Sequence, residues 1–421
     1  MKVYKFGGAS IADPGRMLAL LPIISDEQEP LLIVLSALGK TTNALELIVN
    51  SACQDSKVHA LQLADTLKQQ HLDYARQLLN DPWYVLACDA FIALFNELDT
   101  AVKEADGSRY DESYDQIVCM GELFSSLICS LFLQQHHVAT AWVDIRKVIH
   151  TDDTYRDAAV SLETSQPYAD AIIGIQLKAG KVVVTQGFIG AAPNGRSVTL
   201  GREGSDYTAA LLAAILGMES LTIWKDVNGF RNADPKLFPD TVKLDAISYT
   251  EVIEMAFYGA QIIHPKTIKP LQNSNIPLYV KCFLDKEQEG SVICAEVNDV
   301  AYPPLIVLKD KQVLIQVTTK DFSFITEDNL SRLYSMFHAL KIKINLIQNA
   351  AISFVACIDD REDKISALIQ ALQQDYSVTY NKHMCLLTVR HYTTELLFDL
   401  TKGKQVFLQQ ETRKTAQLIF R

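Results

Sequence analysis

A stretch near the middle of the chain combines residues suited to binding an anion. The β-branched run Val182–Val184 predicts a buried strand, and the Ala/Leu-rich run Tyr207–Leu216 predicts a helix. A glycine-bearing turn between them would leave backbone N–H groups free at the positive end of the helix dipole, which suits an anion. Ser205 or Asp206 could instead simply cap the helix. A cap does not explain Arg202, whose planar guanidinium suits a carboxylate or phosphate, so both readings stay open.

A lysine near the N-terminus offers a second cation. Val3–Phe6 predicts a short strand that contains Lys5, and Gly7 and Gly8 follow it directly. Two adjacent glycines allow the backbone to approach a ligand closely. A lysine in a buried strand either extends to the surface or has a functional reason to be there, and the residue alone does not separate the two.

Two further polar segments follow or interrupt apolar ones. Leu31–Leu35 predicts a second buried strand, and the sequence after it contains Gly39 and Lys40, as a P-loop would. That motif also needs a glycine at position 34, which is Val34, so we exclude a Walker A site. Glu122 stands in an otherwise apolar helical segment. It either lies at a helix end on the surface or needs a partner, because a buried lone carboxylate is costly.

Composition limits the classes of function. The 421 residues allow two or three domains, and 21% charged and 48% hydrophobic residues fit an ordinary soluble globular protein. The net charge of -11 argues against non-specific binding of nucleic acid. The N-terminus lacks an apolar signal core, and no uninterrupted apolar run appears long enough to span a membrane. We therefore expect a cytoplasmic protein with no membrane or nucleic-acid partner.

The eight cysteines form no CxxC pair, and most have apolar neighbours. Reduced, buried cysteines are therefore favoured over disulfides or metal ligands. No zinc, haem or nucleophile-elbow motif is found, and we expect no metal held by a cluster of protein side chains.

The pattern of elements changes towards the C-terminus. Leu45–Asn80 predicts surface helices, and Asp115–Leu133 predicts a helix with a polar capping start. Pro303 and Pro304 mark a boundary, after which strand, helix, strand, strand, helix and strand follow in a ferredoxin-like order. The tail after Tyr392 is short for a second copy of this unit, which would then lack an outer helix.

Several motifs, in order along nearly the whole chain, resemble those of the aspartate kinases within the amino-acid kinase family. TLGREGSDYTAA is similar to the signature TLGRGGSDYTAA, with Glu203 in place of a glycine. VYKFGGAS resembles VxKFGGTS, SALGKTTN resembles SAxGxTTN, and GELFSS resembles GELxS. KDVNGFRNADPK and GAQIIHPKT resemble TDVxGIYTTDPR and GAKVLHPRT, with Gln261 in place of a lysine. The segment with Asp144 and Arg146 matches a family stretch to which we assign a supporting role.

The resemblance implies a fold and a division into domains. The fold is α/β: an amino-acid kinase fold with a mostly parallel central sheet and helices on both faces, followed by C-terminal ferredoxin-like α+β ACT domains. Residues 1–298 would form the catalytic domain, with a nucleotide lobe from about residue 220. Residues 299–421 would form a regulatory region with one full and one shortened ACT unit, interleaved.

The resemblance also implies a reaction. ATP, with Mg²⁺, would phosphorylate the side-chain carboxylate of L-aspartate to give 4-phospho-L-aspartate, the first step towards lysine, threonine and methionine. A lysine or threonine effector would regulate a monofunctional enzyme that is a homodimer or larger homo-oligomer. The alternatives are a kinase for another amino acid or a nucleotide, a non-catalytic amino-acid sensor on the same scaffold, and a fusion with a dehydrogenase. The last is disfavoured because the chain has no GxGxxG-plus-acid unit.

Site residues follow from the matched motifs. Lys5 would contact the transferring phosphoryl group, and Asp206 would orient Lys5. These two are the expected catalytic residues. Arg202 would clamp a substrate carboxylate, and Glu122 would receive its ammonium group. The other expected substrate-binding residues are Ser36, Thr42, Phe188, Gly204 and Ser205. The expected ATP-binding residues are Lys5, Gly7, Gly8, Ser10, Lys225, Asp226, Arg231, Asp234, Lys236 and Gln261. The expected effector residues are Asn345, Gln348 and Asn349.

Overall fold

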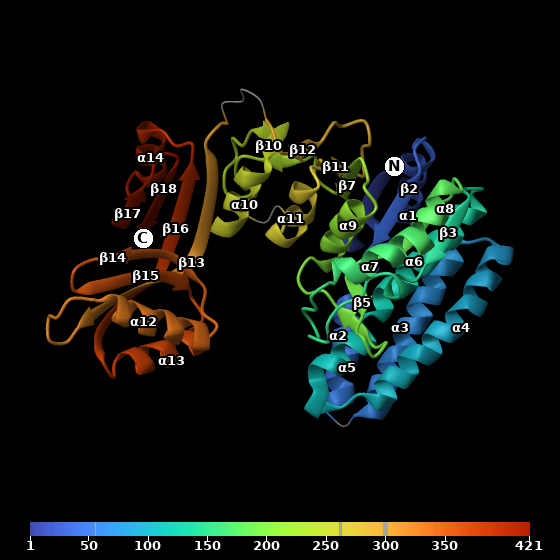
Figure 1. Cartoon of the computed structure of the whole chain (residues 1–421), viewed down its shortest axis with the longest axis horizontal. Coiled ribbons are helices and arrows are strands. Elements are labelled where there is room, and N and C mark those ends of the chain that lie inside the picture. Colours follow the sequence, from blue (N-terminus) through green and yellow to red (C-terminus); the bar gives the residue numbers. More distant parts are fainter. Residues whose placement is uncertain (55, 261–262, 298–301) are drawn as a thin grey trace. The chain divides into compact units, whose positions relative to one another are not determined.

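The chain folds into two compact units in the computed structural model, which describes residues 1–54, 56–260, 263–297 and 302–421 (Figure 1). The first unit comprises Met1–Phe230, Lys243–Ile253 and Ile262–Asn298. The second comprises Arg231–Val242, Glu254–Gln261 and Asp299–Arg421. Each unit has its own sheet and its own core.

An eight-stranded sheet in the order β10-β12-β11-β7-β1-β2-β4-β3 organises the first unit. All its neighbouring strands are parallel except β11 and β12. Its strands are β1 (Lys2–Phe6), β2 (Leu31–Leu35), β3 (Thr140–Val143), β4 (Val182–Gln186), β7 (Ser220–Lys225), β10 (Ala246–Ser248), β11 (Leu278–Cys282) and β12 (Ser291–Cys294). This confirms the expected mostly parallel central sheet.

The central strands of this sheet are buried on both faces. The five residues of β2 are all buried, as are the last four of β1 and of β4. Continuous apolar runs suit a parallel sheet that helices cover on both sides. Because β1, β2, β4 and β7 are parallel neighbours, their carboxyl ends meet at one edge, which is where open α/β sheets bind ligands.

Helices connect the strands of the first unit. They are α1 (Pro14–Ser25), α2 (Thr41–Cys53), α3 (Lys57–Leu78), α4 (Asp81–Glu104), α5 (Tyr110–Val118), α6 (Met120–Gln135), α7 (Leu162–Tyr168), α8 (Ile175–Lys178), α9 (Gly204–Ile215), α10 (Tyr249–Tyr258) and α11 (Pro265–Asn273). The short strands β5 (Ile189–Ala191) and β6 (Ser197–Thr199) form a hairpin, and β8 (Phe230–Arg231) and β9 (Lys243–Leu244) form another small pair. The predicted helices between positions 45 and 80 correspond to α2 and α3, which pack against each other.

Two helix starts differ from the sequence prediction. Asp115 does not cap a helix: it lies inside α5 and is fully buried. Helix α9 begins at Gly204, after Glu203 as the N-cap residue, and no side chain caps it. Ser205 and Asp206 are therefore its first-turn residues rather than its caps. Tertiary contacts occupy two of these carboxylates: Asp115 binds the backbone of Arg156 and Thr199, and Asp206 pairs with Lys5.

One helical stretch has the length and composition of a membrane span. Gly107–Gln135 contains an 18-residue window with a mean hydropathy of 1.7. However, 89% of that window is buried inside the structure. Glu122 interrupts the run, so the stretch agrees with the prediction that no uninterrupted apolar run is long enough to span a membrane. Its burial is what a core helix of this fold requires.

The second unit is built on a six-stranded antiparallel sheet in the order β14-β15-β13-β16-β18-β17. Its elements are β13 (Leu305–Thr319), α12 (Glu327–Ala339), β14 (Ile344–Asn349), β15 (Ser353–Asp359), α13 (Glu362–Leu372), β16 (Tyr376–Arg390), α14 (Thr394–Thr401), β17 (Val406–Glu411) and β18 (Thr415–Phe420). The ferredoxin-like order from β13 to β16 is confirmed.

The two faces of this sheet carry different apolar clusters. Val313, Ile315 and Val317 of β13 pack with α12 and α13 on one face. Leu314 points the other way and packs with Met384 and other residues of a separate cluster. This alternation follows the two-residue period of a strand. The long strands β13 and β16 pair along most of their length. The same sheet continues from β16 to β18 and then to β17.

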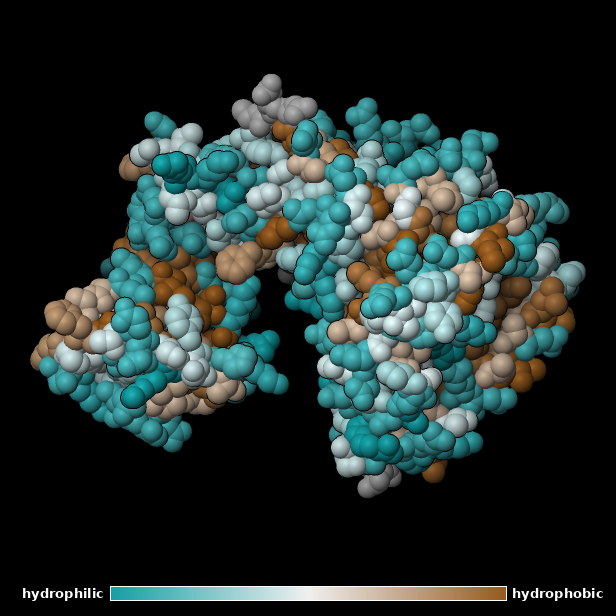
Figure 2. Space-filling view, in the orientation of Figure 1, coloured by the Kyte–Doolittle hydropathy of each residue, from teal (hydrophilic) through white to brown (hydrophobic). Residues whose placement is uncertain are grey.

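The face of the molecule shown in Figure 2 is mainly hydrophilic, with apolar side chains among polar ones. All eight cysteines are unpaired, and four of them, including Cys119 and Cys129, are buried. The expected reduced state therefore agrees with the structure.

Candidate active site

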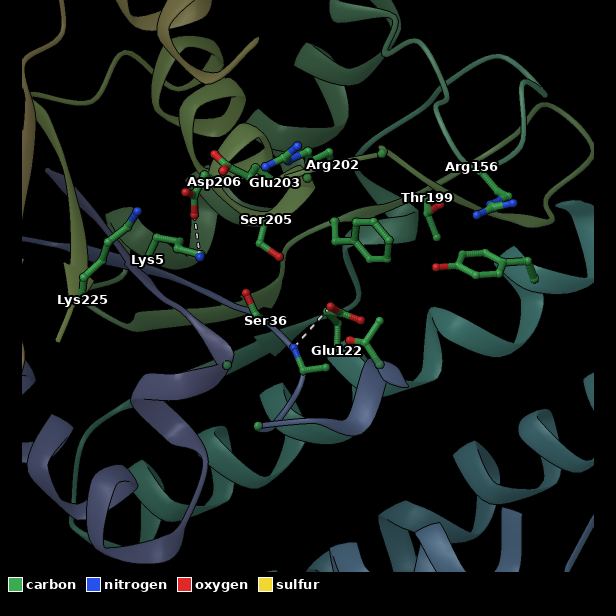
Figure 3. Close-up of a pocket in the computed structure, with 18 residues that line it drawn as sticks. Lys5, Ser36, Glu122, Arg156, Thr199, Arg202, Glu203, Ser205, Asp206 and Lys225 are labelled. Atoms are coloured by element: carbon green, nitrogen blue, oxygen red, sulfur yellow. Dashed lines mark hydrogen bonds and ion pairs between the residues drawn. The ribbon is translucent and has the colours of Figure 1, made fainter. Parts of the chain in front are cut away.

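A pocket of about 550 Å³ opens at the carboxyl edge of the first unit's sheet (Figure 3). Its walls come from the turns that follow β1, β2 and β4, from the end of β7, and from α5, α6 and the start of α9. Its lining residues are Lys5, Gly8, Ser36, Ala37, Gly39, Thr42, Tyr114, Glu122, Arg156, Phe188, Thr199, Gly201, Arg202, Glu203, Gly204, Ser205, Asp206 and Lys225. Segments that lie far apart in the sequence therefore share one cavity.

Lys5 and Asp206 form a close ion pair on the pocket wall. Nζ of Lys5 lies 2.5 Å from Oδ1 of Asp206, and both residues are more than nine-tenths buried. The contact is an ion pair without hydrogen-bond geometry, since Oδ1 of Asp206 has no hydrogen-bond donor among the described residues. Lys5 is thus not a lysine that reaches out to solvent. Asp206 lies in the first turn of α9, where a carboxylate is favourable to the helix dipole.

The turn after β1 must approach the turn after β2 closely. A Cβ on Gly8 would lie 2.6 Å from the carbonyl oxygen of Ala37, so only glycine fits there. The backbone N–H of Gly39 donates to the carbonyl of Gly8 at 3.0 Å and fixes the two turns together. A Cβ on Gly7 would lie 3.5 Å from Nζ of Lys5, so the backbone of Gly7 also runs beside the lysine.

Glu122 presents a buried carboxylate to the pocket from the first turn of α6. Its Oε1 accepts a hydrogen bond from the backbone N–H of Ala37 at 3.2 Å. Its Oε2 has no partner among the described residues, although it is buried. Burial raises the pKa of the Glu122 carboxyl to about 8. An unpaired acceptor of this kind suits a cationic group of a ligand, which would restore the lost interactions.

The turn before α9 is shaped by glycines and by one left-handed glutamate. Gly201 has a φ of 77° and Glu203 has a φ of 55°. A positive φ is ordinary for glycine but uncommon for a residue with a Cβ such as Glu203. A Cβ on Gly204 would lie 2.6 Å from the ring of Phe188, so the helix start and the aromatic ring are in contact. The exposed Arg202 belongs to the same turn and also lines the pocket (Figure 3).

Tyr114, Arg156 and Thr199 are lining residues to which the sequence assigned no role. They lie at the end of the pocket away from Lys5, as Figure 3 shows for Arg156 and Thr199. The Arg156 guanidinium lies 4.4 Å from the centroid of the Tyr114 ring and donates to Asp111 at 3.1 Å. No motif or spacing pointed to Tyr114 and Arg156, and Thr199 begins the motif TLGREGSDYTAA without a role assigned to it. They come from α5, a loop and β6, which only the fold brings together.

Asp115 holds two of these residues in place. Its carboxylate accepts from the backbone N–H groups of Arg156 and Thr199, both at 2.9 Å, and from the Thr199 hydroxyl at 2.7 Å. Burial raises the pKa of Asp115 to about 6, and the three donors oppose that shift. The only sequence signal would have been a carboxylate within an amphipathic helix, which is common on surfaces.

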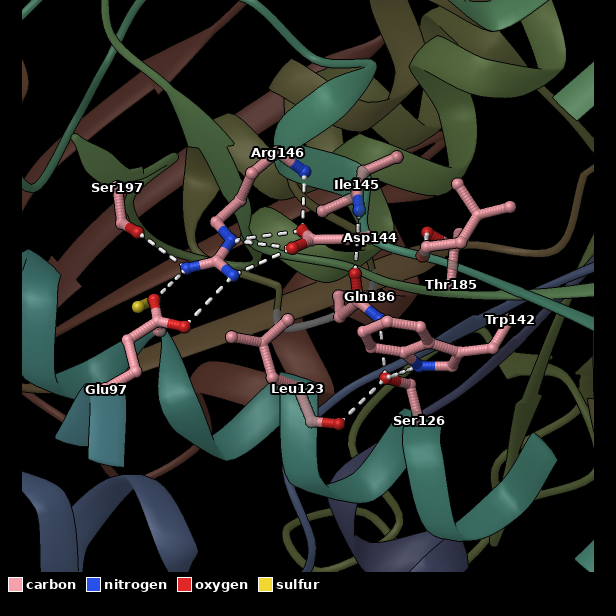
Figure 4. A network of polar contacts seen from close by, with 12 residues as sticks. Glu97, Leu123, Ser126, Trp142, Asp144, Ile145, Arg146, Thr185, Gln186 and Ser197 are labelled. Carbon is pink, nitrogen blue, oxygen red and sulfur yellow. Dashed lines mark hydrogen bonds and ion pairs between the residues drawn. The ribbon is translucent and has the colours of Figure 1, made fainter. Parts of the chain in front are cut away.

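A second polar network supports the pocket from behind (Figure 4). The guanidinium of Arg146 binds Asp144 at 2.7 Å, Ser197 at 3.2 Å, and Glu97 of α4. Gln186, at the end of β4, donates to Ser126 of α6 at 2.6 Å and accepts from the N–H of Ile145 at 2.8 Å. None of these residues lines the pocket. Their contacts hold together α4, α6 and β4, which lie next to the residues that do.

The remaining expected ATP-binding residues lie elsewhere. Ser10 is buried and donates to the carbonyl of Trp224 at 3.2 Å, which ties the first turn to the end of β7. Asp226 is exposed just after β7, outside the set of lining residues. Gln261 lies outside the described residues. Arg231, Asp234 and Lys236 belong to the second unit, and their contact with a nucleotide stays a prediction.

The expected effector residues lie on β14, at one edge of the second unit's sheet. Gln348 and Asn349 are exposed. Asn345 instead joins an internal network: it accepts from Lys309 at 3.0 Å and donates to Gln312 at 2.8 Å and to Asp359 at 2.9 Å. Its polar atoms are already paired, so it has less to offer a ligand than its two neighbours.

Comparison with known proteins identifies the family. A model of the amino acid kinase family matches residues 1–282. Lysine-sensitive aspartokinase 3 of Escherichia coli (strain K12) is 30% identical over 361 residues, which cover 85% of this chain and 78% of that relative. The chain belongs to the amino-acid kinase family, in its aspartokinase branch.

Solved structures agree with this assignment over the full length. E. coli aspartokinase III in complex with lysine and aspartate (T-state) superimposes with a TM-score of 0.83 at 26% identity, covering 100% of this chain and 95% of that one. The complex of E. coli aspartokinase III with aspartate and ADP (R-state) gives 0.82 at 25% identity, with coverage of 100% and 96%. The expected fold of a kinase domain followed by a regulatory region is thereby confirmed.

Proposed function

We propose that the pocket transfers the γ-phosphoryl group of ATP to the side-chain carboxylate of L-aspartate, giving 4-phospho-L-aspartate and ADP. The observation that carries the proposal is one cavity with the buried Lys5–Asp206 pair on its wall and the unpaired Oε2 of Glu122 facing in. Aspartate and ADP in the related E. coli structure support the same two ligands for this chain.

The chemical difficulty is repulsion rather than activation of the nucleophile. The aspartate side chain has an ordinary pKa of about 3.9, so it is ionised at neutral pH and needs no general base. Two unit charges about 4 Å apart repel by ~4 kcal/mol at an effective dielectric constant near 20. Cations and backbone donors must offset this energy and hold the reacting atoms in line. Lys5 and the N–H groups at the start of α9 are the pocket's means of doing so.

Each part of the substrate has a counterpart in the pocket. Lys5, held by Asp206, stabilises the transferring phosphoryl group together with the backbone of Gly7 and Gly8. Glu122 accepts the substrate ammonium group, and Arg202 binds the carboxylate that does not react. The neighbouring lining residues Ser36, Thr42, Phe188, Gly204 and Ser205 complete the amino-acid side of the pocket.

The nucleotide approaches from the side of Lys225, which lines the pocket at the end of β7. Asp226, Arg231, Asp234, Lys236 and Gln261 are proposed to complete the ATP site. Among the described residues, no group of three or more His, Cys, Asp or Glu side chains is placed to hold a metal ion. Magnesium takes one or two carboxylates plus phosphates and waters, and Asp206 offers the carboxylate. When bound, the ion would reduce the charge of the phosphates.

Regulation is proposed to reside in the second unit. An effector amino acid, lysine or threonine, would bind near Gln348 and Asn349 and shift the kinase between two states. The coupling between such sites is typically ~1–3 kcal/mol. Assembly as a homodimer or larger homo-oligomer, and a cytoplasmic location, belong to the same proposal.

Acyl-phosphate formation tests the proposed reaction directly. The full chain would be incubated with ATP, Mg²⁺ and hydroxylamine, which traps an acyl phosphate as a hydroxamate. L-Aspartate, L-glutamate, N-acetylglutamate and no amino acid would be compared. We expect hydroxamate with L-aspartate alone. Turnover with another acceptor would change the substrate, and aspartate binding without any turnover would make the chain a sensor.

A further inference from the structure

Glu203 makes a contact that the glycine of the resembling signature cannot make. Its Oε2 accepts a hydrogen bond at 2.9 Å from the backbone N–H of His264, the N-cap residue of α11. The partners are 61 positions apart in the sequence. A carboxylate at this position also faces the positive end of the α11 dipole, which favours the contact.

The left-handed backbone at Glu203 indicates that this side chain is not there for local reasons. A φ of 55° costs a residue with a Cβ about 1 kcal/mol, whereas glycine adopts it freely. Glu203 is also the N-cap residue of α9, but its side chain caps nothing in its own helix. The side chain instead reaches the start of a different helix.

A second contact joins the same elements, and here the side chain comes from α11 and the backbone acceptor from the turn before α9. Nζ of Lys266, in the first turn of α11, donates to the carbonyl of Leu200 at 3.0 Å and to Asp157 at 2.8 Å. It also lies 4.9 Å from the centroid of the Tyr207 ring of α9. Helices α9 and α11 pack against each other, so the two ties join elements that are already neighbours.

These ties join the two halves of the proposed site. The turn from Gly201 to Glu203 carries Arg202 and leads into Ser205 and Asp206 at the pocket wall. His264 comes three residues after Gln261, which is proposed to be on the nucleotide side. The hydrogen bond from His264 to Glu203 directly joins these two segments.

We infer that Glu203 is a positioning residue that couples the two substrate sites, so that bound nucleotide tightens the binding of L-aspartate. The inference rests on the proposed function and adds to it a cause of substrate synergy specific to this chain. Glu203 acts through the turn that carries Arg202 and does not itself touch the reacting atoms.

Calorimetry with two variants tests the coupling. L-Aspartate would be titrated into the full chain with and without the non-hydrolysable analogue AMP-PNP and Mg²⁺. We expect the analogue to tighten aspartate binding about five-fold in the wild type, a typical coupling for two linked sites. Glu203→Gly relieves the backbone strain but removes the hydrogen bond to His264. In this variant AMP-PNP should leave the affinity for aspartate unchanged, a ratio of about one. Glu203→Gln keeps an acceptor oxygen and should keep most of the effect.

The outcomes separate this inference from the proposed reaction. Equal coupling in the wild type and Glu203→Gly, or no coupling in the wild type, would overturn the role of Glu203 while leaving the kinase reaction intact. A wild-type chain that binds no aspartate in either titration would overturn the proposed function and this inference with it. Thermal melts of both variants would show that the exposed side chain was changed without unfolding the chain.

Discussion

At the scale of single residues, Lys5 and Glu122 show how burial gives ordinary side chains unusual tasks. Lys5 is a cation within a buried strand, and its charge is tolerated because Asp206 lies 2.5 Å away. Glu122 is a carboxylate within an apolar helix, and one of its oxygens has no partner among the described residues. Both residues keep electrostatic interactions available for a ligand, and both can be tested separately.

Replacing Lys5 should affect the chemical step more than binding. We expect Lys5→Ala to lower kcat by about 100- to 1000-fold, because a preorganised cation at developing charge is lost. The KM for L-aspartate should change far less. Steady-state kinetics would measure both. Lys2→Ala is the matched control, since Lys2 lies on the same strand but pairs with Glu27 outside the pocket. A Lys5→Ala enzyme with unchanged kcat would remove Lys5 from the mechanism.

Glu122 should make aspartate binding depend on pH. Burial raises its pKa to about 8 in the empty pocket, so at lower pH the group is protonated and neutral. It must lose that proton to pair with an ammonium group. The KM for L-aspartate should therefore fall by about 16-fold as pH rises from 6.5 to 8, because the ionised fraction of Glu122 rises from about 3% to about 50%, and it should level off about one pH unit higher.

Glu122→Gln provides the control for this pH profile. Its amide does not titrate, so its KM should be high and nearly independent of pH over the same range. Parallel profiles for the wild type and Glu122→Gln would mean that another group controls binding.

At the same scale, Arg202 should act on ground-state binding. It is exposed on the turn before α9 and lines the pocket. We expect Arg202→Ala to raise the KM for L-aspartate by at least about ten-fold, the effect of losing a charge-assisted contact of ~1.5–3 kcal/mol. The KM for ATP should change little. Arg76→Ala, on the outer surface of α3, would control for the loss of one positive charge. An unchanged KM for aspartate would exclude the clamp.

At the scale of elements, the pocket depends on polar contacts that join helices to loops. Asp115 of α5 accepts three hydrogen bonds from Arg156 and Thr199, and it is fully buried. Both backbone N–H groups donate to the same oxygen, Oδ2, and replacing Asp115 by alanine would leave them without this acceptor. Asp115→Ala should therefore lower the free energy of unfolding by about 2 kcal/mol.

Denaturant unfolding of two related variants would check this. Asp111→Ala changes an exposed residue that pairs with the guanidinium of Arg156, so it should cost under about 0.5 kcal/mol. Equal stability of the two variants would show that the Asp115 contacts do not hold these segments. A rise in the KM for aspartate is expected for Asp115→Ala alone, because Thr199 and Arg156 line the pocket.

At the scale of the whole molecule, the second unit offers two kinds of residue on β14. Asn345 is committed to an internal network with Lys309, Gln312 and Asp359, whereas Gln348 is exposed. If an effector binds this strand, Gln348→Ala should raise the concentration of lysine or threonine that gives half-inhibition. A lost neutral hydrogen bond of ~1 kcal/mol corresponds to about five-fold. Activity without effector should be unchanged.

A matched glutamine separates this effect from a general change in the unit. Gln374→Ala alters an exposed residue after α13, away from β14, and should leave inhibition as in the wild type. Inhibition curves with each amino acid would be compared for the three proteins. Equal curves for all three would place the effector elsewhere.

The sequence by itself determined the elements and the main chemical groups. Apolar runs predicted the central strands, since a strand buried on both faces shows its burial in every residue. Ordered motifs indicated Lys5, Glu122, Arg202 and Asp206 as one set, and the structure places all four around one cavity. The six-element order at the C-terminus was likewise visible, because helix and strand periods differ.

The tertiary structure alone decided which distant groups meet. Nothing in the sequence joined Asp115 to Thr199, or Glu203 to His264, because those contacts depend on how loops 60 or more positions apart cross in space. It also decided that Asp115 lies within a helix, where its carboxylate binds the backbone of Arg156 and Thr199. Helix α9 begins at Gly204, so Ser205 lies inside it and does not cap it. Local sequence records periodicity and residue chemistry, whereas the partners of a polar group are set only when the chain is packed.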